Sequence, residues 1–354
     1  MKIALITLHD TDNCGSSLQA FALQHYLLSI GHDCEIIDYV PSYTKNNGRP
    51  IKNFLKKCIY FKDKKNQDIS FKKFKNSFMK LSDLKYKTFE DLRQRPPIAD
   101  IYMTGSDQLW NTYFKCGKDD AYYLKFINNV KKVSYAVSLG RNNYTNEEIK
   151  GLIEKTKDYD KITVRELSSM EILKINNRID AEHVCDPTLL LERSVYEEIK
   201  IDLLKEPYVF IYLTLESDLL DLTILKIKKI YPNHKIVYYG SFKPHCHCDI
   251  HIRTAGPQEF LGLIYNASYV IAGSFHATIF SIIFRKNFII LPSKNNERMI
   301  QLLEMLDLEK NYITYETDLS FISNNIDYNH IYEILDKHVD SSKKVLMEMC
   351  NENK

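Results

Sequence analysis

The sequence predicts an α/β protein with two Rossmann-like domains that face a cleft. Strand-like and helix-like segments alternate along the 354 residues, which is the pattern of parallel sheets. This length suits one large or two medium domains, and the pattern restarts in the second half of the chain. We therefore expect an N-terminal domain over residues 1–200 and a C-terminal domain over residues 201–354.

Composition restricts the class of protein. Hydrophobic residues make up 44% of the chain and charged residues 27%, which is ordinary for a globular protein with a sizeable core. A formal net charge of +2 argues against a dedicated nucleic-acid-binding protein, so we expect no nucleic-acid partner. No apolar run approaches ~18 residues, the start reads as a strand rather than a signal peptide, and the 8 cysteines are scattered. We expect a cytoplasmic protein with reduced thiols.

The first βαβ unit is the clearest element. Residues 2–8 (KIALITL) form a buried-strand run, and residues 10–17 (DTDNCGSS) form a loop of turn formers. Residues 18–31 carry apolar side chains at helical spacing and end at Gly31, which suits a C-terminal cap. The run CEIIDYV, residues 34–40, supplies the next strand.

Residues 45–98 interrupt this alternation with many lysines interleaved with Phe, Tyr and Ile. We expect helical segments that form an insertion or lid, ending at RQRPP, residues 93–97. Two interpretations stay open for the lysines. They form either a solvated helical face or a peripheral contact with an anionic membrane surface.

Regular alternation resumes after this insertion. Strand-like runs in the N-terminal domain are DIYMTG (100–105), KVSYAVSL (132–139), KITV (161–164) and EHVCD (182–186). A charged segment that ends in a proline marks the domain boundary near residue 200. Strand-like runs in the C-terminal domain are YVFIYLTL (208–215), HKIVYYG (234–240), DIHIR (249–253), YVIAG (269–273) and NFIILP (287–292), and helices follow from about residue 295.

Ligands of such sheets bind beyond the carboxyl ends of the strands, which selects four loops for inspection. The first loop, DNCGSS (12–17), either binds an anion at the start of a helix or forms a capped turn. In the second loop, Ser106 or Asp107 caps a following helix. Trp110 in the same loop either stacks on a sugar ring or packs in the core.

The third and fourth loops carry the charged and titratable candidates. Ser168 and Glu171 have the spacing of a capping box, so Arg165 lies just ahead of a helix. Arg165 either pairs with Glu166 or binds a carboxylate or phosphate. His276, in GSFHATIFSIIF (273–284), opens an apolar helix. It is either a packed histidine or an acid/base group acting on an anionic substrate.

One further run concentrates metal-ligand side chains. HCHCDIH, residues 245–251, contains three histidines, two cysteines and an aspartate. Neighbouring residues of an extended segment point to opposite faces, and a second ligand pair that would complete a tetrahedral site is missing from the sequence. We therefore expect no metal, while a metal site between His245 and His251 stays the open alternative.

Several stretches together resemble the polysaccharide pyruvyl transferase family. DNCGSSLQAFALQHYL is similar to its N-Y-G-S-x-L-Q-A-Y-A-L-Q signature, with Cys14 where the family often has Tyr. TGSDQLWN, SYAVSLG, TVRELSS, CDPTLLL, AGSFHATIFSIIFRKNFI and ERMIQLLEMLDL follow in the same order. The resemblance runs from residue 3 to about 310, except at the lysine-rich insertion and around 215–255.

The resemblance implies a fold similar to the two-domain GT-B glycosyltransferases. The implied activity is transfer of the enolpyruvyl group of phosphoenolpyruvate onto a sugar, giving a pyruvate ketal and phosphate without a cofactor. It implies His276 as general acid/base and Arg165 as anion-binding catalytic residue. The N-terminal domain is expected on the acceptor side. The substrate-binding positions that the motifs imply are Asn13, Gly15, Ser16, Ser106, Asp107, Ser138, Ser274 and Arg298.

The chain departs from the family at one of these positions. Many members have an arginine two residues before the histidine, where this chain has Ser274, although one branch also reads S-F-H. The second cation is therefore unassigned. Arg298 and Arg285 are the substitutes, and Arg298 is the better one because its motif also recurs in that branch.

Two other functions stay open. A nucleotide-sugar-dependent GT-B glycosyltransferase of polysaccharide biosynthesis would share the fold, which cannot separate the two. A non-enzymatic assembly partner would use the lysine-rich stretch to dock on a membrane. The partners expected of the transferase are phosphoenolpyruvate and a saccharide acceptor, lipid-linked or free, at the inner face of the cytoplasmic membrane.

Overall fold

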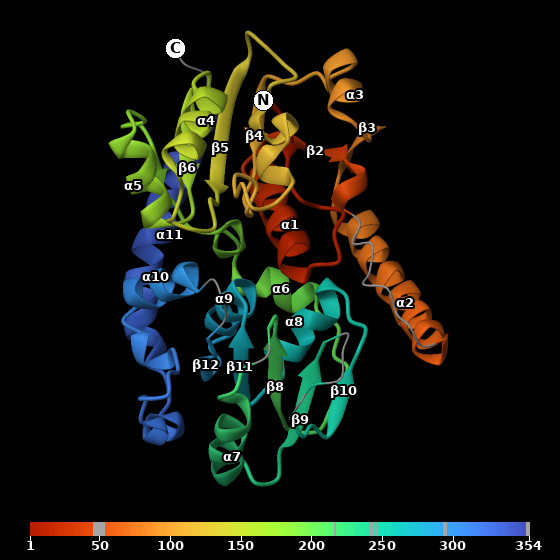
Figure 1. Cartoon of the computed structure of the whole chain (residues 1–354), viewed down its shortest axis with the longest axis vertical. Helices are drawn as coiled ribbons and strands as arrows, with labels where there is room; N and C mark the ends of the chain where they lie inside the picture. Colours follow the sequence, from red (N-terminus) through yellow and green to blue (C-terminus); the bar gives the residue numbers. More distant parts are fainter. Residues whose placement is uncertain (45–53, 216, 241–243, 245, 293–295, 352–354) are drawn as a thin grey trace. The chain divides into compact units, whose positions relative to one another are not determined.

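The computed structural model describes residues 1–44, 54–215, 217–240, 244, 246–292 and 296–351 (Figure 1). It confirms the α/β class, because its strands form two parallel sheets connected by helices. The chain divides into two compact units. Unit 1 comprises Met1–Gly48, Lys75–Leu191 and Asp336–Lys354, and unit 2 comprises Arg49–Phe74 and Glu192–Leu335.

Unit 1 is built on a seven-stranded parallel sheet in the order β3-β2-β1-β4-β5-β6-β7. Strand order reverses at β1, as in doubly wound folds, where ligands bind beyond the carboxyl ends of the strands. The strands are β1 (Lys2–Ile6), β2 (Asp33–Tyr39), β3 (Leu81–Tyr86), β4 (Ile101–Thr104), β5 (Lys131–Val137), β6 (Lys161–Val164) and β7 (Glu182–His183). The helices of this unit include α1 (Cys14–Ser29), α3 (Phe89–Gln94), α4 (Asn146–Thr156) and α5 (Leu167–Ile175).

The first βαβ unit forms as its pattern predicts. Ile3 to Ile6 of β1 are fully buried, because both faces of this central strand are covered. Helix α1 begins after Asn13, whose side chain accepts a hydrogen bond from the backbone N–H of Ser16. It ends before Gly31, which has a φ of +90° that favours glycine.

The lysine-rich insertion is not helical throughout, which corrects one expectation. Residues 81–86 form β3, which pairs with β2 at the edge of the sheet. Its sequence LSDLKY lacks apolar alternation, because only Ser82 and Tyr86 are buried. An edge strand with charged side chains resists pairing with other chains, and such strands give a weak sequence signal. Helix α2 (Phe54–Phe78) provides the expected helical part.

Unit 2 is built on a five-stranded parallel sheet in the order β10-β9-β8-β11-β12. All five strands coincide with runs expected from the sequence: β8 (Tyr208–Leu213), β9 (Lys235–Tyr239), β10 (Ile250–Ile252), β11 (Tyr269–Gly273) and β12 (Phe288–Ile290). Its helices include α6 (Arg193–Ile199), α7 (Leu220–Ile230), α8 (Pro257–Tyr265), α9 (Phe275–Ile283) and α10 (Glu297–Met305). Helix α9 packs against both β11 and β12.

The chain passes between the units inside two helices. Helix α2 contributes residues 54–74 to unit 2 and residues 75–78 to unit 1. Helix α11 (Tyr328–Cys350) belongs to unit 2 up to Leu335 and to unit 1 from Asp336. Leu346 and Cys350 are fully buried, so the end of α11 belongs to a core and not to a separate tail.

Over the described residues, the helices are all too short or too polar to cross a lipid bilayer.

Candidate active site

Five of the expected site residues of unit 1 are connected at the carboxyl edge of its sheet. The hydroxyl of Ser16, in the first turn of α1, donates to a carboxylate oxygen of Asp107 at 2.5 Å. The backbone N–H of Ser138, just past β5, donates to the carbonyl oxygen of Asp107 at 2.9 Å. Ser106 accepts a long contact of 3.4 Å from the guanidinium of Arg165. Asn13 and Gly15 belong to the same loop as Ser16.

The backbone at this edge is strained. Asp107 has a φ of +84° and Ala136 a φ of +52°, and both lie in the left-handed region that residues with a Cβ seldom adopt. Asp107 forms a bridge to Val137, directly after Ala136, so the two strained residues belong to neighbouring segments. Such strain persists only where the surrounding structure fixes it, and it concentrates at functional sites.

Ser138 presents a buried hydroxyl at this edge. Its side chain is fully buried, and its Oγ has no hydrogen-bond partner among the residues that the structure describes. A buried hydroxyl without a partner costs free energy, on the order of 1–3 kcal/mol. A ligand or water that reaches Ser138 would recover this cost.

Arg165 follows β6, as expected, but its guanidinium is engaged inside the protein. Its side chain is 1% exposed, with Nη1 2.6 Å from Asp186 and Nε 3.3 Å from Glu166. Burial alone would lower the pKa of Arg165, but the nearby carboxylates of Asp186, Glu166 and Asp107 outweigh burial and raise it. These contacts are those of a positioning residue that joins the ends of β4, β6 and β7. Direct contact of Arg165 with an anion stays a prediction.

Two local expectations around these loops were wrong. Helix α5 begins at Leu167 with Glu166 as its N-cap residue, so Ser168 and Glu171 do not form the expected capping box. Instead, the hydroxyl of Ser169 donates to Glu166 at 3.0 Å. Residues 105–115 form turns, so neither Ser106 nor Asp107 caps a helix.

Trp110 is a core residue. It is fully buried, stacks on Tyr123 with ring centroids 5.6 Å apart, and donates its indole N–H to the carbonyl oxygen of Tyr122 at 3.1 Å. Stacking of Trp110 on a sugar ring is therefore excluded in this conformation.

A buried contact between a histidine and an aspartate, which the sequence analysis missed, follows β1. His9 is 3% exposed, and its two ring nitrogens lie 3.0 Å from a carboxylate oxygen of Asp38 and 3.2 Å from the carbonyl oxygen of Thr7. Both contacts are hydrogen bonds only when both nitrogens carry protons. Burial would raise the pKa of Asp38, but His9 and Lys85 outweigh burial and lower it. The position of His9, three residues after the carboxyl end of β1, was the available signal.

In unit 2, His276 lies at the amino end of α9, directly beyond β11. It is partly exposed, and its ring contacts the ring of Phe275 edge to face, with centroids 5.5 Å apart. Ser274 caps α9, because its Oγ accepts the backbone N–H of Ala277 at 3.2 Å. A serine in this position therefore has a structural role that an arginine would not fill.

Arg298 lies near Phe275, the residue that precedes His276. It stands in the first turn of α10, and its ζ-carbon lies 5.5 Å from the ring centroid of Phe275, the neighbour of His276. Arg285 lies past the opposite end of α9, where its ζ-carbon is 4.6 Å from the ring centroid of Tyr332. The structure thus favours Arg298 over Arg285 as the cation beside the amino end of α9.

The metal-ligand run does not form a cluster in the part of the chain that the structure describes. Groups of three or more His, Cys, Asp or Glu side chains that could hold a metal ion are not found there. His251 contacts the carbonyl oxygen of Gly240 at 2.7 Å, and Asp249 accepts the backbone N–H of Ile236 at 2.7 Å. His245 lies outside the described residues.

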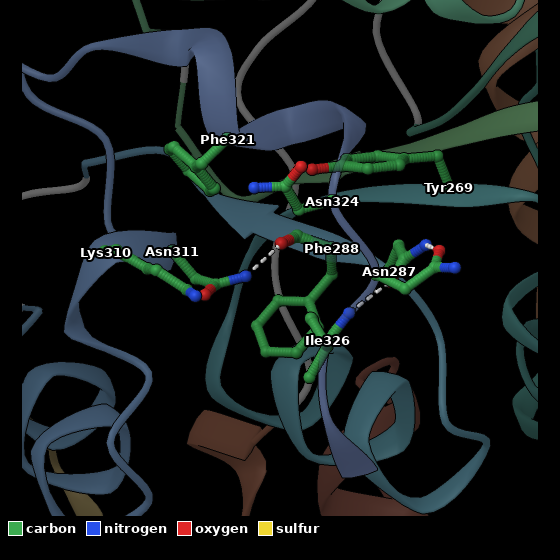
Figure 2. Close-up of a pocket in the computed structure, with 9 residues that line it drawn as sticks. Tyr269, Asn287, Phe288, Lys310, Asn311, Phe321, Asn324 and Ile326 are labelled. Atoms are coloured by element: carbon green, nitrogen blue, oxygen red, sulfur yellow. Dashed lines mark hydrogen bonds between the residues drawn. The ribbon is translucent and has the colours of Figure 1, made fainter.

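Two hollows of unit 2 lie at opposite edges of its sheet. One lies at the amino ends of β11 and β12, where Asn311 donates to the carbonyl oxygen of Phe288 at 2.6 Å (Figure 2). The other lies at the carboxyl ends of β8 and β9, and its lining includes Asp218, Asp221 and Tyr238. The first is remote from the expected site residues, and the carboxylates of the second disfavour an anion.

A chain with two parallel α/β sheets, as found here, has the fold class of the GT-B glycosyltransferases. Solved structures with the same fold support this fold class. The chain is similar to UDP-GlcNAc 2-epimerase from Neisseria meningitidis, with a TM-score of 0.54, 11% identity and 100% of each chain covered. It is also similar to an α-glucosyltransferase solved with UDP and DNA, with a TM-score of 0.52, 11% identity and 99% and 100% covered. The UDP-GlcNAc 2-epimerase of Methanocaldococcus jannaschii matches with a TM-score of 0.51, 14% identity and 99% of each chain covered. At these identities, the likeness shows the fold alone.

The family follows from the sequence match. The family model of polysaccharide pyruvyl transferase matches residues 13–295, which is most of the chain. The protein therefore belongs to the polysaccharide pyruvyl transferase family and is a transferase, as the ordered motifs predicted. A search of the curated proteins found no match.

Proposed function

We propose that this protein transfers the enolpyruvyl group of phosphoenolpyruvate onto a sugar of a surface polysaccharide or of its lipid-linked precursor. The products are a pyruvate ketal and phosphate. The observation that carries the proposal is the position of His276, a half-buried histidine at the amino end of α9, in the same unit as Arg298, whose ζ-carbon lies 5.5 Å from the ring centroid of its neighbour Phe275. Membership of the family supports the reaction class.

The reaction needs a group that both gives and accepts a proton. His276 gives a proton to the methylene carbon of phosphoenolpyruvate, which creates an oxocarbenium-like centre at the next carbon. A sugar hydroxyl attacks this carbon and returns its proton to His276. The carbon–oxygen bond to phosphate breaks, and the second sugar hydroxyl closes the ketal ring while its proton leaves with the phosphate. Atoms and electrons of this reaction balance without an oxidant, a metal or a cofactor.

The charges of the two units favour different substrates. Arg298 and the amino end of α9 place positive charge near His276, which suits the carboxylate and phosphate of the donor. The edge of unit 1 offers the hydroxyls of Ser16 and Ser138 and the carboxylate of Asp107, which suit the hydroxyls of a neutral sugar. We therefore assign the donor to unit 2 residues and the acceptor to unit 1 residues.

The test is a coupled measurement of both products. The protein is incubated with phosphoenolpyruvate and saccharide from the polysaccharide pathway of the same cell, and we expect release of phosphate together with a new ketal methyl signal in the NMR spectrum. Release of a nucleoside diphosphate from a nucleotide sugar would instead favour a glycosyltransferase. His276→Ala should lower kcat by about 10²–10⁴-fold, which is the usual contribution of a general acid/base. Undiminished activity of His276→Ala would overturn the assignment.

Substitutions of Arg298 and Arg285 distinguish direct binding of the donor by Arg298 from a nonspecific effect of removing one positive charge. Arg298→Ala should raise KM for phosphoenolpyruvate by at least about tenfold, because a charge-assisted hydrogen bond is lost. Arg285→Ala removes the same charge at the other end of α9 and should leave this KM unchanged. Equal effects of the two substitutions would exclude a specific role for Arg298.

We also propose that the lysine-rich helix contacts the inner face of the cytoplasmic membrane. Residues Lys62, Lys65, Lys72 and Lys73 of α2 are exposed and share the spacing of one helical face with the exposed Ile69. The same helix buries Phe71 and Phe74. A basic face with an exposed apolar residue suits anionic lipid headgroups, which are the surroundings of a lipid-linked acceptor.

A further inference from the structure

The loop that follows β4 presents an exposed aromatic ring fixed on a buried arginine. Tyr113 is 62% exposed, and the guanidinium carbon of Arg141 lies 3.8 Å from the centroid of its ring. Arg141 itself is only 7% exposed, and the ring of Tyr144 covers it at 3.9 Å. The arginine is thus held between two tyrosines, and its contact leaves much of the Tyr113 ring in solvent.

The guanidinium is fixed by hydrogen bonds as well as by stacking. One terminal nitrogen of Arg141 donates to the hydroxyl of Thr112 at 2.6 Å and pairs with the carboxylate of Glu148. The other donates to the carbonyl oxygen of Asn143 at 2.5 Å. The ion pair with Glu148 neutralises the arginine, so this surface has no excess positive charge to attract an anionic donor.

The ring and its arginine belong to the same two loops as three of the proposed acceptor-side residues. Tyr113 belongs to the loop after β4 that contains Ser106 and Asp107, and Arg141 belongs to the loop after β5 that begins with Ser138. The two loops are joined, because the hydroxyl of Tyr144 donates to the carbonyl oxygen of Trp110 at 3.0 Å. Both loops belong to unit 1.

We propose that Tyr113, seated on Arg141, is the platform on which a pyranose ring of the saccharide acceptor stacks. The C–H groups of one pyranose face are apolar and weakly positive, and they match the negative face of an aromatic ring. Because Arg141 already holds the ring in place, binding loses little side-chain entropy. Phe114, the next residue of the loop, is also exposed, at 48%. The proposal rests on the proposed function for the identity of the acceptor.

Direct binding tests the platform without the reaction. The methyl pyranosides of glucose, galactose and mannose serve as probes in saturation-transfer NMR with the full-length protein. We expect saturation transfer from the wild-type protein to at least one pyranoside, with affinity about five- to tenfold lower in Tyr113→Ala. Tyr113→Phe keeps the ring and should retain binding. Tyr315→Ala, which removes a tyrosine that is 78% exposed in unit 2, is the matched control and should also retain it.

The outcomes separate the platform from the proposed function. Pyranoside binding that depends on Tyr113 supports the platform even if phosphoenolpyruvate releases no phosphate, in which case only the proposed function fails. Once the transfer reaction is measured, Tyr113→Ala should raise KM for the acceptor while KM for phosphoenolpyruvate stays unchanged. Binding that is equal in the wild-type and Tyr113→Ala proteins, or absent for all three pyranosides, would overturn the platform.

Discussion

Two stacked histidines make the stability of unit 1 depend on pH. His183, at the end of β7, and His338, in α11, have ring centroids 4.7 Å apart and planes inclined by 27°. Burial, together with a smaller effect of His183, lowers the pKa of His338 to about 4, and burial also lowers the pKa of His183. Both groups therefore favour the neutral form in the folded protein. Because His183 also contacts the carbonyl oxygen of Arg165 at 3.1 Å, this pair adjoins the candidate site.

The direction and size of the effect follow from the two pKa values. An unfolded histidine has a pKa of about 6.5, so between this pH and pH 4 the unfolded chain binds more protons than the folded chain. The free energy of unfolding therefore falls as the pH is lowered through this window. For His338 alone, the loss is about 1.4 kcal/mol at pH 5.5 and on the order of 3 kcal/mol near pH 4.

The measurement is urea unfolding at pH 7.5 and pH 5.5, followed by fluorescence of Trp110, the single tryptophan, which lies in the core of unit 1. His338→Phe keeps a stacked ring but cannot be protonated, so it should lose about 1.4 kcal/mol less than the wild-type protein between the two pH values. His247→Phe removes a histidine whose side chain is 83% exposed and is the control. An equal pH dependence of the wild-type and His338→Phe proteins would refute the reasoning.

Two further predictions concern the ion pairs of the buried Arg165 and the membrane contact proposed for the exposed lysines of α2. Arg165→Met leaves the carboxylates of Asp186 and Glu166 buried without their cation, so unit 1 should lose about 3–5 kcal/mol of stability, and adding Asp186→Asn should restore part of it. Both changes are read from urea unfolding, and a double variant no more stable than the single one contradicts the pairing. The protein should sediment with liposomes of anionic lipids at low salt and be released at high salt. Replacing Lys62, Lys65, Lys72 and Lys73 by Glu should abolish this binding. Binding that survives the replacement would exclude these lysines of α2 as the membrane contact.

Strands with continuous apolar runs were predictable because burial on both faces leaves a local signature in the sequence. The run YVIAG coincides with β11, and all of its residues are buried. The strand LSDLKY had no such signature, because as an edge strand it buries only Ser82 and Tyr86. Its place in the sheet depends on pairing with β2, which is distant in the sequence and therefore invisible to a local pattern.

The candidate site was likewise predictable where it depends on local sequence and not where it depends on contacts between distant residues. Positions after strand ends indicated which residues gather at the carboxyl edge, and Ser16, Asp107 and Ser138 do so. What each side chain contacts could not be read from position alone. Arg165 has the expected place, but Asp186, 21 residues further along the chain, binds its guanidinium. Trp110 was considered for stacking because of its place in the second loop, but the structure buries Trp110 in the core and leaves Tyr113 of the same loop exposed.

The division of α11 between the two units has a consequence for biosynthesis. Unit 1 includes Asp336–Lys354, and all of the residues Glu192–Leu335 of unit 2 are translated before this segment. The nascent chain therefore carries all strands of the first sheet, but the surfaces that Leu346 and Cys350 later cover are still open while the second sheet is being made. Fragments that end near residue 191 would stay in this incomplete state, so the halves of this transferase are poor candidates for separate expression.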